Sequence, residues 1–153
     1  MNQESGRSMI EMIGVLAIMG ALTGVAFVMI TDATASQKQR ETVDEVAIIV
    51  SKVQDLHRGF DDFSVMDGPR ILNMMGKVKN PYGGSYDLMV DSSDSRRFIV
   101  SINGLDKSEC EALSMYAWTD SVGYRLSDKK QSGATGSCDG AHGTNVVQIT
   151  FGE

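Results

Sequence analysis

Glu11 is the residue of this 153-residue chain with the most distinctive chemistry, because it lies at the edge of a long apolar segment. Residues 12–31 contain no charged side chain, and Met9 and Ile10 precede Glu11. A carboxylate inside the hydrocarbon of a membrane costs a few kcal/mol unless a cation pairs with it. We therefore expect Glu11 either to reach the water at a membrane surface or to bind a cationic group within the hydrocarbon.

The other side chains that could do chemistry do not form a recognisable active site. The two histidines, His57 and His142, lie far apart, and no hydrolase, zinc-protease, P-loop or dinucleotide-binding motif is present. Asp91 and Asp94 could ligate a hard cation such as calcium, but their spacing is not that of an EF-hand, and a solvated acidic turn is the more ordinary interpretation. We expect no enzyme activity, no catalytic residue, no metal and no cofactor.

The apolar segment that must position Glu11 has the length of a membrane span. Its twenty residues would rise about 30 Å as a helix, the thickness of the hydrocarbon core. Three uses remain open: a secretory signal peptide cut after residues 33–35, a permanent anchor, and a helix that leaves the bilayer to pack with copies of itself. The signal-peptide interpretation is weakened by length, since such apolar regions have about 7–15 residues. Counting Lys and Arg gives no clear orientation.

The charge balance limits the partners. The chain has 14 Lys and Arg against 20 Asp and Glu, which gives a net charge of -6. Nucleic-acid binding needs clustered cations, so no nucleic-acid partner is predicted. The length fits one globular domain with an appendage.

The residues from Gly6 onward, G-R-S-M-I-E-M-I-G-V-L-A-I-M-G, resemble the N-terminus of type IV prepilins and of the related pseudopilins. The resemblance implies that a prepilin peptidase cuts after Gly6 and then N-methylates the new first residue, Arg7. It also implies that Glu11, as the fifth mature residue, pairs with the N-terminal amine of a neighbouring subunit during assembly. The mature chains of the family usually start with Phe or Met, and their leaders usually carry Lys or Arg. This chain would instead start with Arg7, and its six-residue leader has neither Lys nor Arg. These two departures bear on the methylation of Arg7 more than on the cleavage after Gly6.

The same resemblance implies partners and a location. The subunit would be a single-pass inner-membrane protein before assembly and part of an extracellular helical homo-oligomeric filament afterwards. Its partners would be the prepilin peptidase and the inner-membrane pilus assembly machinery. Whether the subunit is major or minor, and whether it serves adhesion, motility, DNA uptake or conjugation, stays open.

Beyond the apolar segment, a helical pattern continues without proline as far as residue 58. Val43, Val46 and Val50 recur at helical spacing, which predicts an amphipathic stem that ends near Gly59. In the apolar half, Gly14, Gly20 and Gly24 are candidates for helix packing, since Gly20 and Gly24 form a G-x-x-x-G motif. The predicted organisation is a leader at 1–6, a membrane or filament-core helix half at 7–31, a stem at 32–59 and a head at 60–153.

The head is predicted to be α+β, with an antiparallel sheet packed on the long helix, as in type IV pilins. An aromatic residue followed by Gly-Gly, at residues 82–84, also resembles the type IVb-like subgroup. The alternation of apolar and polar residues, the turn residues and a capping box predict the elements of the head. They are a short helix at 70–75, a hairpin of strands at 85–90 and 97–102, a helix at 106–117, and strands at 122–126 and 146–151.

Cys110 and Cys138 are the only two cysteines. Their spacing excludes a CxxC redox motif, and an exported head would face an oxidising space, so we expect an intramolecular disulfide. The resemblance implies that it closes a C-terminal loop, as in pilins, and that it pins the Gly/Ser-rich segment 132–144.

Two rival interpretations remain. The first keeps the family and makes the chain a pseudopilin of a type II secretion system. The second makes it a secreted or membrane-anchored binding domain that begins near Ser36.

Overall fold

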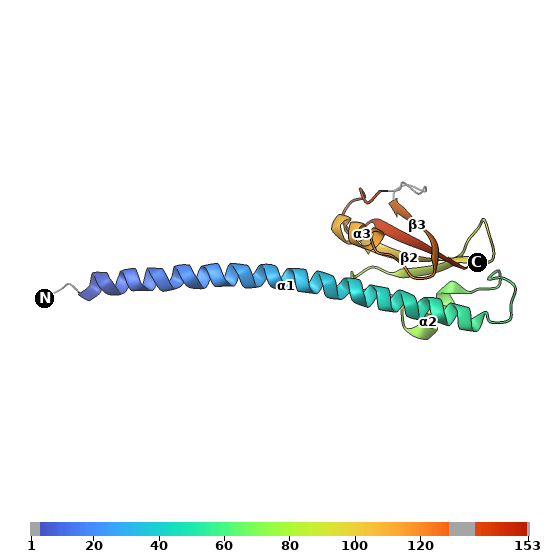
Figure 1. Cartoon of the computed structure of the whole chain (residues 1–153), viewed down its shortest axis with the longest axis horizontal. Helices are drawn as coiled ribbons and strands as arrows, with labels where there is room; N and C mark the ends of the chain where they lie inside the picture. The colour runs from blue at the N-terminus through green and yellow to red at the C-terminus, as the bar shows by residue number, and fades with distance from the viewer. Residues whose placement is uncertain (1–3, 129–136, 153) are drawn as a thin grey trace. The chain divides into compact units, whose positions relative to one another are not determined.

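The computed structural model describes the backbone of residues 4–128 and 137–152, and the side chains of residues 9–123 and 137–152. The chain divides into two units, Met1–Gln37 and Lys38–Glu153. The first helix, α1, spans Glu4–Leu56 without interruption, as the absence of proline predicts (Figure 1). Gly59 follows with a φ of +98°, a left-handed conformation that suits glycine and stops the helix.

The second unit has the α+β architecture that the sequence predicts. Four strands form one antiparallel sheet in the order β1-β2-β4-β3. The elements are α2 (Gly68–Met75), β1 (Tyr86–Val90), β2 (Arg97–Leu105), α3 (Lys107–Ser114), β3 (Ser121–Asp128) and β4 (Asn145–Gly152).

Some element bounds differ from the prediction. Strand β2 continues beyond residue 102, although Asn103 and Gly104 look like a turn. Asn103 still pairs with Val146 of β4, and a register shift between Asn103 and Leu105 accommodates Gly104 at φ +81°. Helix α3 is shorter than the predicted 106–117. The long antiparallel partner β4 extends the ladder past the point at which the local sequence pattern fades.

The core of the second unit lies between the stem part of α1 and the sheet. Val46, Ile49 and Val53 project from α1 at helical spacing and are buried. They belong to one cluster with alternate residues of the strands, because every second side chain of a strand points to the same face. The strand members of the cluster are Tyr86, Leu88, Phe98, Val100, Ile102, Leu105, Val147, Ile149 and Phe151.

The loop before β1 is fixed by a buried amide. The side-chain oxygen of Asn80 accepts hydrogen bonds from the backbone N–H groups of Tyr82 (3.1 Å) and Gly84 (2.9 Å). Its amide nitrogen donates to the carbonyl of Asn103 at 2.7 Å. A Cβ atom on Gly84 would lie 1.8 Å from that same carbonyl oxygen, so this approach requires glycine. The Gly-Gly signal thus marks a close contact between the loop and β2.

Candidate functional site

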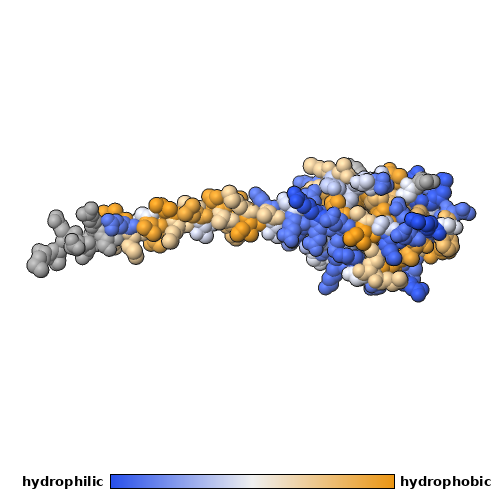
Figure 2. Space-filling view, turned by 60° about the horizontal axis from the view of Figure 1, so that its bottom comes forward, coloured by the Kyte–Doolittle hydropathy of each residue, from blue (hydrophilic) through white to orange (hydrophobic). Residues whose placement is uncertain are grey.

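The N-terminal half of α1 exposes an apolar surface along its whole described length. Every described side chain from Met9 to Ser36 is solvent-exposed, and the most apolar stretch has none of its residues buried within the chain. Figure 2 shows apolar residues gathered along this part of the helix. By length and composition, α1 is the one helix in the described part of the chain that is apolar enough to cross a membrane. A helix buried in the core of a soluble domain would not have this exposed apolar surface.

The hydroxyl groups within and just after the apolar segment are satisfied inside the helix. Thr23 donates to the carbonyl oxygen of Met19 at 2.7 Å, and Thr31 donates to that of Val28 at 2.7 Å. Thr34 donates to the carbonyl of Ile30 at 2.8 Å. In hydrocarbon no water is present to bind a hydroxyl, so this back-bonding lets threonine enter lipid or a packed helix bundle at low cost.

The candidate packing glycines do not form a single stripe. With about 100° between successive helical residues, Gly20 and Gly24 lie on one face, whereas Gly14 lies on another. Apart from the adjacent residues and the backbone of the same helical turns, no described atom lies within 4 Å of the position that a Cβ would take at any of the three. The surface beside Gly20 and Gly24 is therefore open to a second helix, while Gly14 can contribute only to a different contact.

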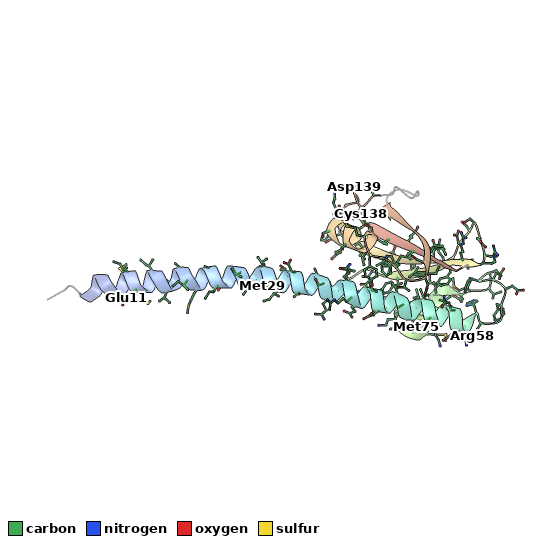
Figure 3. The ribbon with its side chains drawn as sticks, in the orientation of Figure 1. Glu11, Met29, Arg58, Met75, Cys138 and Asp139 are labelled. Atoms are coloured by element: carbon green, nitrogen blue, oxygen red, sulfur yellow. A yellow bond between two sulfur atoms is a disulfide. The ribbon has the colours of Figure 1, made fainter. Side chains whose placement is uncertain are left out.

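Glu11 lies on an exposed face of α1, four residues after Arg7 (Figure 3). The backbone of Gly6 and Arg7 belongs to α1. The Arg7 side chain, and with it part of the predicted processing site, lies outside the described residues, as do residues 1–3 of the predicted leader.

A polar clamp that sequence reasoning missed joins the stem to the head sheet. Glu45 of α1 accepts a hydrogen bond from the Lys77 ammonium at 2.6 Å and another from the Tyr86 hydroxyl at 2.8 Å. Glu45 and Tyr86 are buried, whereas Lys77 is partly exposed. Burial, together with the adjacent Glu45 carboxylate, raises the pKa of Tyr86 far above its usual value, so the hydroxyl stays protonated and donates.

Cys110 and Cys138 form a disulfide, in agreement with the pairing expected from the sequence. It links α3 to the segment before β4, and both cysteines are buried. Near it in the sequence, Lys107 forms an ion pair with Asp139 at 3.0 Å, and His142 Nδ1 contacts the Asp106 carboxylate. The capping box predicted at Asp106 and Glu109 is present. Of the loop that the disulfide was expected to pin, residues 132–136 lie outside the described residues.

Removal of the disulfide should lower the stability of the head. In the Cys110→Ala/Cys138→Ala double variant we expect a loss of about 3.5 kcal/mol, because the crosslink restricts the unfolded chain. Thermal unfolding of the full chain in detergent, followed by the fluorescence of Trp118, the only tryptophan, would measure it. Reduced wild-type protein should match the variant. Equal unfolding midpoints for oxidised and reduced protein would contradict the prediction.

The remaining candidate side chains have local structural roles. His57 contacts the rings of Phe60 and Phe63, with centroids 6.1 and 5.1 Å away. Asp91 accepts hydrogen bonds from the N–H and hydroxyl of Ser93. Asp94 forms ion pairs with Arg96 and Arg97, and backbone and side-chain hydrogen bonds from Arg96 lower the pKa of Asp94. In the described parts of the chain, no cluster of three potential metal ligands occurs.

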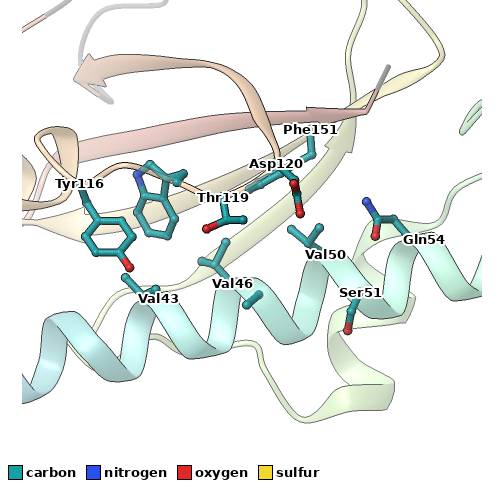
Figure 4. A pocket seen from close by; sticks show the side chains of 11 residues that line it. Val43, Val46, Val50, Ser51, Gln54, Tyr116, Thr119, Asp120 and Phe151 are labelled. Carbon is teal, nitrogen blue, oxygen red and sulfur yellow. The ribbon is translucent and has the colours of Figure 1, made fainter.

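A groove lies beside the stem part of α1 and was not foreseen from the sequence (Figure 4). Its volume is about 320 Å³. Its residues come from α1, from the segment between α3 and β3, and from β4. They are Val43, Val46, Ala47, Val50, Ser51, Gln54, Tyr116, Trp118, Thr119, Asp120 and Phe151.

No family model matches the chain. Two curated proteins are similar to it, each described as the major structural subunit of bundle-forming pilus, from Escherichia coli O111:H- and from Escherichia coli O127:H6 (strain E2348/69 / EPEC). Each is 24% identical over 145 residues, which covers 86% of this chain and 75% of the relative. The chain is thus weakly similar, over most of its length, to major structural subunits of a pilus.

This relationship supports the resemblance to type IV pilins and extends it. The sequence motif is specific only around residues 6–31, whereas the similarity to the pilus subunits covers most of the chain. The long N-terminal helix and the four-stranded antiparallel sheet are consistent with the type IV pilin fold. The relatives are structural subunits, in agreement with the expectation that the chain is not an enzyme.

Proposed function

We propose that the chain is a structural subunit of a type IV pilus. The observation that carries the proposal is the exposed apolar half of α1, on a chain related over most of its length to a major structural pilus subunit. Such a surface is stable only in hydrocarbon or against other apolar helices. It would anchor the precursor in the inner membrane and later form the buried centre of an extracellular homo-oligomeric filament.

Cleavage after Gly6 would create a cationic group that Glu11 of a neighbouring subunit can bind. The cut creates an ammonium group at Arg7, four residues or about 6 Å of helix rise before the carboxylate. The amine of one subunit and the carboxylate of another can meet when their helices are offset by about one turn. In hydrocarbon this pairing would both offset the cost of the buried charge and set the register of the subunits.

The principal alternative within the same family is a pseudopilin of a type II secretion system. It shares the leader, Glu11 and the apolar helix, so these residues do not distinguish the two functions. The relationship to bundle-forming pilus subunits favours the pilus. Deletion should therefore remove visible filaments, whereas loss of protein secretion with no effect on filaments would favour the pseudopilin.

N-terminal mass spectrometry of the mature protein tests the processing directly. We expect a chain that begins at Arg7, with or without an added methyl group. The variant Gly6→Val should keep the leader, because the peptidase recognises the glycine before the cut, and should form no filaments. A control substitution within the leader, Asn2→Ala, should be processed normally. A mature chain that begins at Ser36 would instead identify a cleaved signal peptide and contradict the proposed function.

A further inference from the structure

The groove beside α1 has room for a large apolar side chain. Its floor is formed by the buried residues Val46, Val50 and Phe151, and Trp118 packs beside them. Its volume of about 320 Å³ lies at the small end of the range for ligand pockets, about 300–1,000 Å³. Apolar floors of this kind are where the anchor residues of protein interfaces insert.

One end of the groove carries a negative charge. Asp120 lines the groove together with Thr119 and Gln54, and Figure 4 shows its carboxylate over the Val50 end of the floor. None of the ion pairs between described side chains, residues 9–123 and 137–152, includes Asp120. Its φ of +61° is unusual for a residue other than glycine and places Asp120 in a tight turn just before β3. An apolar side chain that lies next to a cation would match both parts of the groove.

An exposed arginine and an exposed aromatic residue follow the C-terminal end of α1 in the sequence, and Figure 3 shows Arg58 there. Phe60 is 63% exposed, although it is aromatic, and the Arg58 side chain is 84% exposed. The Phe60 N–H donates to the carbonyl of His57 at 3.0 Å, and its ring contacts the His57 ring, so Phe60 is held in place before any binding. Arg58 pairs with Asp55 at 3.1 Å, an exposed contact that a second acidic group can replace at little cost.

We propose that the groove of one copy accepts Phe60 of a second copy, with Arg58 of that copy beside Asp120. The proposal rests on the proposed function, because a filament grows through contacts between two different surfaces of the same chain. Exposed aromatic and arginine side chains are enriched at such contacts, and apolar pockets bind them. The charge pair would select the orientation of the incoming subunit.

Photo-crosslinking of assembled filaments locates Phe60. Benzoyl-phenylalanine at position 60 should link to peptides that contain residues 43–54 or 116–120 of another copy, as mass spectrometry of the digested product would show. The same group at Val65, which is 70% exposed, should give at least about fivefold less of this product. Crosslinks from position 60 to lipid, to another protein or to other peptides of the subunit would overturn the inference while leaving the filament function intact. If the unmodified chain forms no filaments, the proposed function fails, and this inference fails with it.

A charge reversal tests the ion pair. Arg58→Asp and Asp120→Arg should each lower filament yield by about fivefold or more, because each places like charges together at the contact. The double variant should recover at least about half of the wild-type yield, since it restores the pair with its polarity reversed. Arg70→Asp, at another exposed arginine of the head, should have little effect. A double variant no better than either single variant would overturn the predicted pairing of Arg58 with Asp120.

Discussion

Replacement of Glu11 by alanine is expected to abolish filament assembly while membrane insertion of the precursor continues. The variant makes the apolar segment more hydrophobic, so insertion should be unchanged or improved. In the filament, the N-terminal amine of a neighbour would lose its partner in a low-dielectric environment. Breaking a buried ion pair by removing one member costs about 3–5 kcal/mol, which corresponds to a loss of more than about 100-fold in assembly.

The measurement separates the two steps. Membrane fractionation reports insertion, and electron microscopy with quantification of sheared filaments reports assembly. Glu4→Ala is a suitable control, because it removes a carboxylate that the mature chain is predicted to lack. Glu11→Gln keeps the size of the side chain without the charge and should behave like the alanine variant. Wild-type numbers of filaments from Glu11→Ala would show that Glu11 has no part in assembly.

Glu45→Ala is expected to give the largest loss of head stability among single substitutions in the clamp. The Tyr86 hydroxyl would be left buried without its acceptor, and Lys77 would lose its carboxylate. An unsatisfied buried group costs about 1–3 kcal/mol, and the lost charge contact adds to it, so we expect about 3 kcal/mol in total. The unfolding midpoint of the full chain in detergent, followed by Trp118 fluorescence, should fall by about 10 °C.

The matched control lies one helical turn away. Glu41 is exposed, so Glu41→Ala should change stability by less than about 0.5 kcal/mol. Tyr86→Phe keeps the ring in the core, removes the hydroxyl and should cost less than Glu45→Ala. Because the pKa of Tyr86 is raised in the folded state, its contribution is present below the unfolded pKa of about 10 and is lost as pH rises above that value. Equal unfolding midpoints for Glu45→Ala and Glu41→Ala would show that the clamp does not stabilise the head.

The element types of the chain follow from local patterns. An uncharged run of twenty residues, a helical repeat of valines and the absence of proline were enough to predict α1, since each depends on neighbours within one or two turns. Alternation and turn residues predicted the four strands and their α+β class in the same way. The bounds were less accurate. Gly104 has the appearance of a turn residue, but β2 continues through it, and its pairing with β4 shifts register between Asn103 and Leu105.

The sequence by itself determined the features whose chemistry is local: the apolar segment, Glu11 four residues after Arg7, and a single possible pairing of cysteines. The tertiary structure alone decided the clamp and the groove. Lys77 and Tyr86 lie 32 and 41 residues from Glu45, and the groove combines parts of α1, the segment after α3 and β4. Contacts at such separations depend on how the strands pair and on which helix face packs against the sheet. No local spacing encodes this, because the sequence of α1 does not specify which residue of the sheet each buried side chain of the helix will contact.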